Sequence, residues 1–204
     1  MRRVLCALLA AALALPLAGC RRGADFLPYG REIEGMELMQ TLGVDAAEAG
    51  QVAVTASSGA GDGPDSGATV VNGSAATLSA AVLGLQSEGA SYLYFGHVGQ
   101  LLAGEELARR GLWPVLDYVL RDVEMRLDTA LYLVRGGEAG AALEAAAEEG
   151  SASRRLEAMA ANAGLLAGSA PRTVKDALAD LYAQGATFLP AVEAEPGLPA
   201  AGYG

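Results

Sequence analysis

The spacing of apolar and polar residues along the chain predicts a succession of strands and helices. Apolar side chains at positions 36, 38, 42 and 44 favour a strand over residues 36–45, and residues 51–55 alternate as a second strand. The short segment between them is typical of a turn, so we expect these two strands to form a hairpin.

The remaining pattern completes an alternation of strands and helices. β-Branched and aromatic runs predict strands at 92–98 (continuing weakly to 102), 129–134 and 187–192, and apolar stripes predict helices at 75–87, 105–110, 113–120, 138–149, 151–166 and 174–184. Thr173 is positioned to cap the last of these helices. The order indicates an α/β fold, or an α+β fold, with a mixed sheet packed with several helices.

Composition marks the connections and the ends of the domain. Residues 57–73 are dense in Gly, Ser, Asp and Pro, which predicts a mobile loop. Pro and Gly recur after Val192. We therefore expect a signal peptide (1–19), a tether (20–30), one domain (31–192) and a flexible tail (193–204).

The first twenty residues have the pattern of a bacterial export signal. Arg2 and Arg3 precede an apolar run over residues 4–17, which is shorter than the about 20 residues that span a bilayer. Small residues stand directly before Cys20, as in a bacterial lipobox. We expect cleavage before Cys20 and a diacylglyceryl group (palmitate) on its thiol, which would hold the chain on the extracytoplasmic side of a membrane. The alternative is an ordinary secretory signal whose cysteine falls there by chance.

Charge narrows the possible partners. The chain has 14 Lys and Arg against 24 Asp and Glu, a net charge of −10, whereas nucleic-acid phosphates attract basic proteins. We therefore expect no nucleic-acid partner. Loss of Arg2 and Arg3 on cleavage would leave 12 − 24 = −12. Anionic lipid heads would repel such a domain, so the lipid itself must provide the anchor.

No group of residues points to catalysis, and we expect no enzyme, no cofactor and no metal site. His97 is the single histidine, and its apolar surroundings predict a buried or half-buried structural role. The Gly-rich residues 59–67 lack the Lys-Ser/Thr of a phosphate-binding loop, and Asp62 and Asp65 lack the spacing of an EF-hand. Processing would remove Cys6 and consume Cys20, so no nucleophilic cysteine would remain.

Alternating charges follow the helix predicted over residues 113–120. The residues concerned are Arg121, Asp122, Glu124 and Arg126. A solvated turn accounts for such a pattern, and a polar docking surface for a partner protein is the functional alternative.

Short segments spread in order along the chain resemble the Ger(x)C family, the lipoprotein C subunits of spore germinant receptors. They are the lipobox at 17–20 (LAGC), residues 31–34 (REIE) with 42–45 (LGVD), 93–98 (LYFGHV) with 104–108 (GEELA), 116–117 (LD) with 121–126 (RDVEMR), and 173–178 (TVKDAL) with 188–190 (FLP). Two departures are Arg21–Arg22, where the family has Trp-Asp, and Val123, where proline is common. The chain ends at Gly204, where the family continues into a large C-terminal domain. We therefore expect the N-terminal domain only, in a member reduced to that half or in a truncated gene.

The resemblance implies a place and a role. The family's C subunits are held by lipid on the outer face of the spore's inner membrane, where they act in nutrient-triggered germination with two integral-membrane subunits of A and B type. It supplies no catalytic or ligand-binding residue. We therefore expect a membrane-anchored subunit that works by tethering and protein–protein contact. The alternative is a free-standing extracytoplasmic lipoprotein that binds a small ligand, against which the aromatic content of 5% argues.

Overall fold

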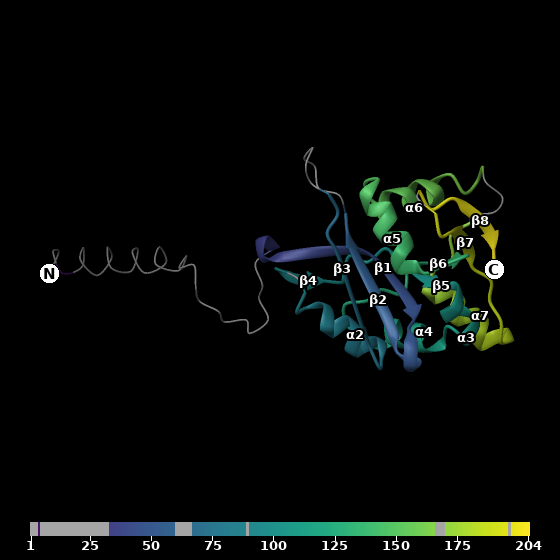
Figure 1. Cartoon of the computed structure of the whole chain (residues 1–204), viewed down its shortest axis with the longest axis horizontal. Coiled ribbons are helices and arrows are strands. Elements are labelled where there is room, and N and C mark those ends of the chain that lie inside the picture. Colours follow the sequence, from purple (N-terminus) through teal and green to yellow (C-terminus); the bar gives the residue numbers. More distant parts are fainter. Residues whose placement is uncertain (1–3, 5–32, 60–66, 89, 166–169, 196) are drawn as a thin grey trace. The chain divides into compact units, whose positions relative to one another are not determined.

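The strands form one mixed sheet with helices on both of its faces (Figure 1). The computed structural model describes residues 4, 33–59, 67–88, 90–165, 170–195 and 197–204, and residues 35–204 belong to one compact unit. Cys20 and the predicted tether lie outside the described residues, as does the predicted signal peptide apart from Val4.

The sheet has the order β3-β2-β1-β5-β6-β7-β8, with β4 also beside β1. Its strands are β1 (Met36–Ala46), β2 (Val52–Ser58), β3 (Val70–Ala75), β4 (Tyr92–Tyr94), β5 (Gln100–Gly104), β6 (Ala130–Arg135), β7 (Pro190–Glu193) and β8 (Ala200–Tyr203). The strands β1, β5, β6 and β7 run parallel, β4 runs parallel to β1, and β2, β3 and β8 are antiparallel to their neighbours. This topology confirms the predicted α/β class with a mixed sheet, and it confirms the β1–β2 hairpin.

The described residues form six α-helices close to the predicted ranges. They are α2 (Leu78–Leu85), α3 (Glu105–Arg110), α4 (Trp113–Arg121), α5 (Ala139–Glu148), α6 (Ala152–Ala161) and α7 (Val174–Gln184), with short 3-10 turns η2 (Ile33–Gly35) and η3 (Glu48–Gly50). Helix α6 ends at Ala161 rather than at the predicted residue 166, and residues 162–165 form a turn.

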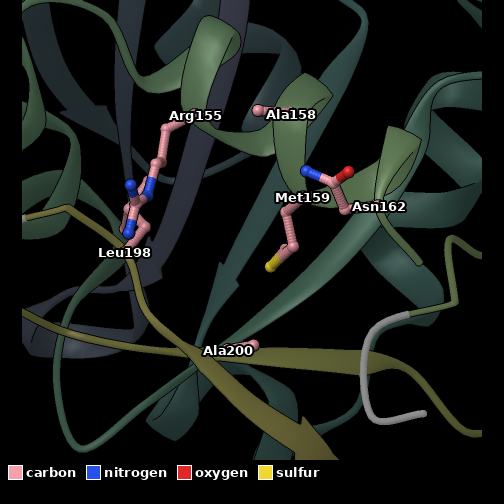
Figure 2. A pocket seen from close by; sticks show the side chains of 6 residues that line it. All are labelled: Arg155, Ala158, Met159, Asn162, Leu198 and Ala200. Atoms are coloured by element: carbon pink, nitrogen blue, oxygen red, sulfur yellow. The ribbon is translucent and has the colours of Figure 1, made fainter. Parts of the chain in front are cut away.

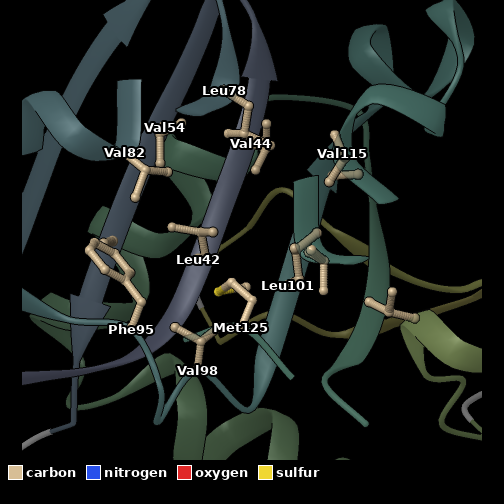
Figure 3. Close-up of a cluster of buried hydrophobic side chains, with 14 of the residues drawn as sticks. Leu42, Val44, Val54, Leu78, Val82, Phe95, Val98, Leu101, Val115 and Met125 are labelled. Carbon is tan, nitrogen blue, oxygen red and sulfur yellow. The ribbon is translucent and has the colours of Figure 1, made fainter. Parts of the chain in front are cut away.

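Successive residues of the central strands point to opposite faces of the sheet, which divides the core in two. Leu101 and Leu131 belong to a cluster with α2, α4 and α7. The residues that follow them, Leu102 and Tyr132, belong to a second cluster with α5 and α6. Figure 3 shows part of the first cluster, where Val115 of α4 and Leu101 of β5 are both buried. The sheet is therefore covered on both sides, as expected of parallel strands.

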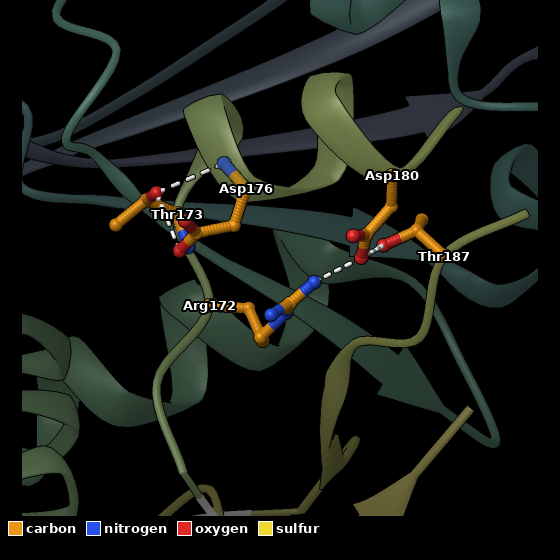
Figure 4. A network of polar contacts seen from close by, with 5 residues as sticks. All are labelled: Arg172, Thr173, Asp176, Asp180 and Thr187. Atoms are coloured by element: carbon orange, nitrogen blue, oxygen red, sulfur yellow. Dashed lines mark hydrogen bonds and ion pairs between the residues drawn. The ribbon is translucent and has the colours of Figure 1, made fainter. Parts of the chain in front are cut away.

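Polar contacts fix the start and the middle of α7 (Figure 4). The hydroxyl of Thr173 accepts from the backbone N–H of Asp176 at 3.2 Å, and the Asp176 carboxylate accepts from the backbone N–H of Thr173 at 3.0 Å. This capping box confirms Thr173 as the predicted cap. Farther along the helix, the Asp180 carboxylate pairs with Arg172 and accepts from the Thr187 hydroxyl at 3.0 Å. The helix is thus tied to the chain that enters β7.

Three connections differ from the sequence prediction. Residues 57–73 are not one loop, because β2 extends to Ser58 and Val70–Ala75 form the edge strand β3. Residues 92–98 are not one strand, because a turn at Gly96 and His97 separates β4 from β5. Residues 193–204 are not a tail of irregular chain: β8 pairs with β7, and Leu198 is fully buried. In the first and third cases, pairing with a distant strand orders residues that local composition assigns to a loop, whereas at residues 96–97 a turn interrupts a run that composition assigns to a strand.

Candidate partner-contact site

The segment with alternating charges, residues 121–126, begins at the last residue of α4 and leads toward β6. Its turn is built by Asp122, whose Oδ1 accepts from the backbone N–H of Glu124 at 2.9 Å and of Met125 at 3.2 Å. Met125 points inward and is buried in the first core cluster. The Asp122 carboxylate therefore serves the local fold, as Asp side chains do in many turns.

Glu124 fastens this turn to the neighbouring strand. Its Oε1 accepts from the hydroxyl of Tyr92 at 2.8 Å, and its Oε2 accepts from the backbone N–H of Phe95 at 3.1 Å. Both partners belong to the segment of β4 and the turn after it. Of the four predicted contact residues, Asp122 and Glu124 thus use their carboxylates for hydrogen bonds within the domain.

The two arginines stay on the surface. The Nε of Arg121 lies 2.8 Å from Asp117 Oδ1, and Arg126 holds Asp128 through two contacts of 2.5 and 2.8 Å. The Arg126 guanidinium lowers the pKa of the Asp128 carboxyl by hydrogen bonding to it. Exposed pairs of this kind contribute little to stability. Arg121 and Arg126 are therefore the charged groups of this segment that a partner can reach.

An apolar groove next to the segment was not predicted from the sequence. Val123 is 97% exposed and Leu83 of α2 is 73% exposed, and both line a pocket of about 310 Å³ that also includes Phe95 and Tyr118. A neighbouring pocket of about 530 Å³ shares Tyr118. Burial, followed by the nearby charge of Asp122, raises the pKa of the Tyr118 phenol. Exposed apolar side chains gathered around a groove are typical of protein-interaction surfaces.

Two apolar residues that do not fit the core pattern of the sequence could have predicted this groove. Helix α2 has its core stripe at Leu78, Val82 and Leu85, and Leu83 is an apolar residue outside that stripe. Val123 likewise stands among charged residues in a turn. We define Leu83, Val123, Arg121 and Arg126 as the groove surface.

The prediction for His97 is wrong. The imidazole is exposed on the turn between β4 and β5, where it meets the ring of Tyr94 edge to face at 5.9 Å between centroids. The apolar run around it predicted a continuous strand, and the turn at Gly96 moves the side chain to the surface. Asp62 and Asp65 lie outside the described residues. Within the described ranges, no three His, Cys, Asp or Glu side chains gather as a metal site would require.

The carboxyl ends of the parallel strands, where α/β proteins often bind anions, hold carboxylates of the chain itself. Asp45, at the end of β1, is buried and accepts from the backbone N–H of Ala139 at 2.7 Å and of Gly140 at 2.8 Å at the start of α5. Burial raises the pKa of Asp45, and the two backbone donors oppose that shift. Glu105 accepts from the backbone N–H of Gly136 at 2.7 Å. The donors that would bind a phosphate at this helix terminus are thus already used.

The comparisons with known proteins place the chain in a family. None of the helices in the described part of the chain is both long and apolar enough to cross a membrane. No curated protein and no solved structure proved significantly similar. A family model described as spore germination protein N-terminal domain matches residues 30–194, which is most of the chain and contains all of the groove surface. The chain therefore belongs to the family of spore germination protein N-terminal domains, and its role is in germination.

Proposed function

We propose that this protein is a membrane-anchored lipoprotein subunit of a spore germinant receptor, which acts in nutrient-triggered germination by tethering and protein–protein contact. The observation that carries the proposal is the match of the germination family over residues 30–194. In this proposal the chain is not an enzyme. Its partners are the integral-membrane receptor subunits of A and B type.

The amino-terminal sequence supports the anchoring part of the proposal. A basic pair, an apolar run and small residues before Cys20 follow one another in the order of a lipoprotein signal. One acyl chain binds a bilayer only marginally, whereas the two chains of a diacylglyceryl group hold firmly. An anchor at Cys20 would place the domain on the outer side of the spore's inner membrane, next to membrane-embedded partners. Confinement raises the effective concentration, so weak contacts suffice.

The groove surface supports the contact part. Leu83 and Val123 are exposed apolar residues that line one pocket, Arg121 lines the neighbouring pocket, and Arg126 is an exposed charge of the same segment. Apolar anchors with arginine at the border are common in protein interfaces. We infer that an extracytoplasmic segment of a membrane subunit docks here.

Anchoring is tested by the variant Cys20→Ala. We expect it to lose incorporation of labelled palmitate, to leave the membrane fraction of spores and to slow nutrient-triggered germination. Cys6→Ala is the matched control, because Cys6 precedes the expected cleavage site and should change none of the three. If Cys20→Ala stays in the membrane fraction and germination is unchanged, the anchoring proposal fails.

Contact is tested by placing a charge in the groove. We expect Val123→Asp to reduce recovery of the membrane subunits with the tagged, solubilised protein by about tenfold, because a buried unpaired carboxylate costs more than 1.4 kcal/mol. Leu165→Asp is the matched control, since Leu165 is also highly exposed but lies beyond α6. Equal recovery of the subunits with both variants would contradict docking at the groove.

A further inference from the structure

Another pocket, distinct from the groove surface, lies at the amino end of β5. It has a volume of about 330 Å³, and it is lined by residues of the sheet and of the first turns of α6. Its lining is polar and includes Gln40, His97, Gln100, Ser151, Arg154 and Glu157. These residues come from β1, the β4–β5 turn, β5 and α6, which are far apart in the sequence.

Gln100 brings a buried amide to this pocket. Only 6% of the residue is exposed, and its Oε1 accepts from the hydroxyl of Thr41, also buried, at 3.3 Å. Its amide nitrogen has no hydrogen-bond partner among the described residues. This nitrogen is open to the pocket, so it offers a donor that a hydrogen-bonding ligand there can use.

A chain of hydrogen bonds fixes the opposite wall. The hydroxyl of Ser153, which is buried, donates to Gln40 Oε1 at 2.6 Å and lies 2.8 Å from the hydroxyl of Ser151. Ser151 also caps α6 by accepting from the backbone N–H of Arg154 at 3.5 Å. The polar groups are therefore held in place before any ligand arrives, which lowers the entropy cost of binding.

The charged side chains that line the pocket sum to zero, so the pocket does not favour a ligand with a net charge. Arg154 and Glu157 carry opposite charges one turn apart on α6, so their charges cancel. The other groups are amides and hydroxyls, which both donate and accept hydrogen bonds. Ligand hydroxyl groups have the same double capacity. We propose that this pocket binds a small, uncharged polyhydroxylated molecule of the size of a monosaccharide or a cyclic polyol. The inference does not depend on the groove or on the anchor.

Ligand-observed NMR by saturation transfer tests this proposal on the full-length protein. The probes are D-glucose, myo-inositol and glycerol, with glycine and acetate for comparison. The protein is solubilised in a zwitterionic detergent, because a sugar-based detergent would compete for the pocket. We expect saturable binding of at least one polyhydroxylated probe and none of glycine or acetate.

A matched pair of variants locates the binding. Arg154→Ala removes a pocket residue, whereas Arg155→Ala changes the next residue of the same helix, which lines a separate pocket of about 230 Å³ with Met159 and Leu198 (Figure 2). We expect Arg154→Ala to weaken binding about tenfold, as loss of a hydrogen bond to a charged group does, and Arg155→Ala to leave it unchanged. Gln100→Leu, checked for folding by circular dichroism, should weaken binding as well.

Three results would overturn the proposal. They are the absence of saturable binding by every polyhydroxylated probe, preferential binding of glycine or acetate, and binding that Arg154→Ala and Gln100→Leu leave unaltered. Retention in the membrane fraction and recovery of partner subunits measure the proposed function separately, so the two proposals can fail independently.

Discussion

The two ends of the parallel strands hold similar polar groups but use them differently. At the carboxyl end, Asp45 accepts backbone N–H groups from the start of α5, and Glu105 accepts one from the connection between β6 and α5. At the amino end, Gln100 and Ser153 face a pocket that stays open. We call these the closed end and the open end of the sheet.

The difference shows that a fold class does not determine where a ligand binds. In parallel α/β sheets the carboxyl ends of the strands are the usual binding edge. Here the helix donors at that edge are occupied by buried or hydrogen-bonded carboxylates, and the polar space lies at the opposite edge. Residues of the closed end should therefore affect stability, and residues of the open end should affect binding.

The largest effect is expected at Asp45. Asp45→Ala would leave the backbone N–H groups of Ala139 and Gly140 buried without their acceptor, and we expect it to lower the free energy of unfolding by about 3 kcal/mol. Urea denaturation followed by fluorescence of Trp113, the single tryptophan, measures the change. Glu48→Ala, on the exposed turn η3, is the control and should have little effect. A loss as small as that of the control would show that the closed end does not support the fold.

A somewhat smaller effect is expected at Gly104, which makes room for Asp45. A Cβ at Gly104 would overlap Asp45 Oδ1, and crowding of this kind costs about 2 kcal/mol. Gly84→Ala is the matched control: a Cβ at that exposed position of α2 meets nothing within 4 Å, and alanine in a helix stabilises by about 0.5–1 kcal/mol. We therefore expect opposite signs for the two substitutions. If Gly104→Ala proves neutral in the same urea experiment, the Asp45 side chain can move away from the added Cβ, and the closed end is less rigid than we infer.

The sequence predicted the regular elements better than the sites between them. Apolar periodicity located α4 and α7 to within a residue, because their buried stripes are continuous. It missed β3 and β8, since their pairing with β2 and β7 depends on tertiary contacts that local composition does not contain. His97 illustrates the same limit, because a turn at Gly96 changes which side of the chain faces the solvent.

The candidate sites were predictable only in part. The charges at Arg121 and Arg126 are visible in the sequence, and the structure leaves them exposed. The sequence could not show that the carboxylates of Asp122 and Glu124 fold the turn, because their partners are backbone N–H groups and a tyrosine 32 residues away. The pocket at the open end is lined by residues of β1, β5 and α6, which are far apart in the sequence, so no residue spacing along the chain predicts it.

The smallest effect on stability is expected at the open end. Glu157 is exposed on α6 and lines the pocket, so Glu157→Ala should change the free energy of unfolding by less than about 0.5 kcal/mol. The same urea titration measures it, with Asp45→Ala as the counterpart from the closed end. If Glu157→Ala destabilised the protein as strongly as Asp45→Ala, the pocket residues would be parts of the fold's support, and the contrast between the two ends would disappear. A negligible change would mean that the Glu157 carboxylate is not needed for folding, so ligand binding can make use of it at little cost in stability.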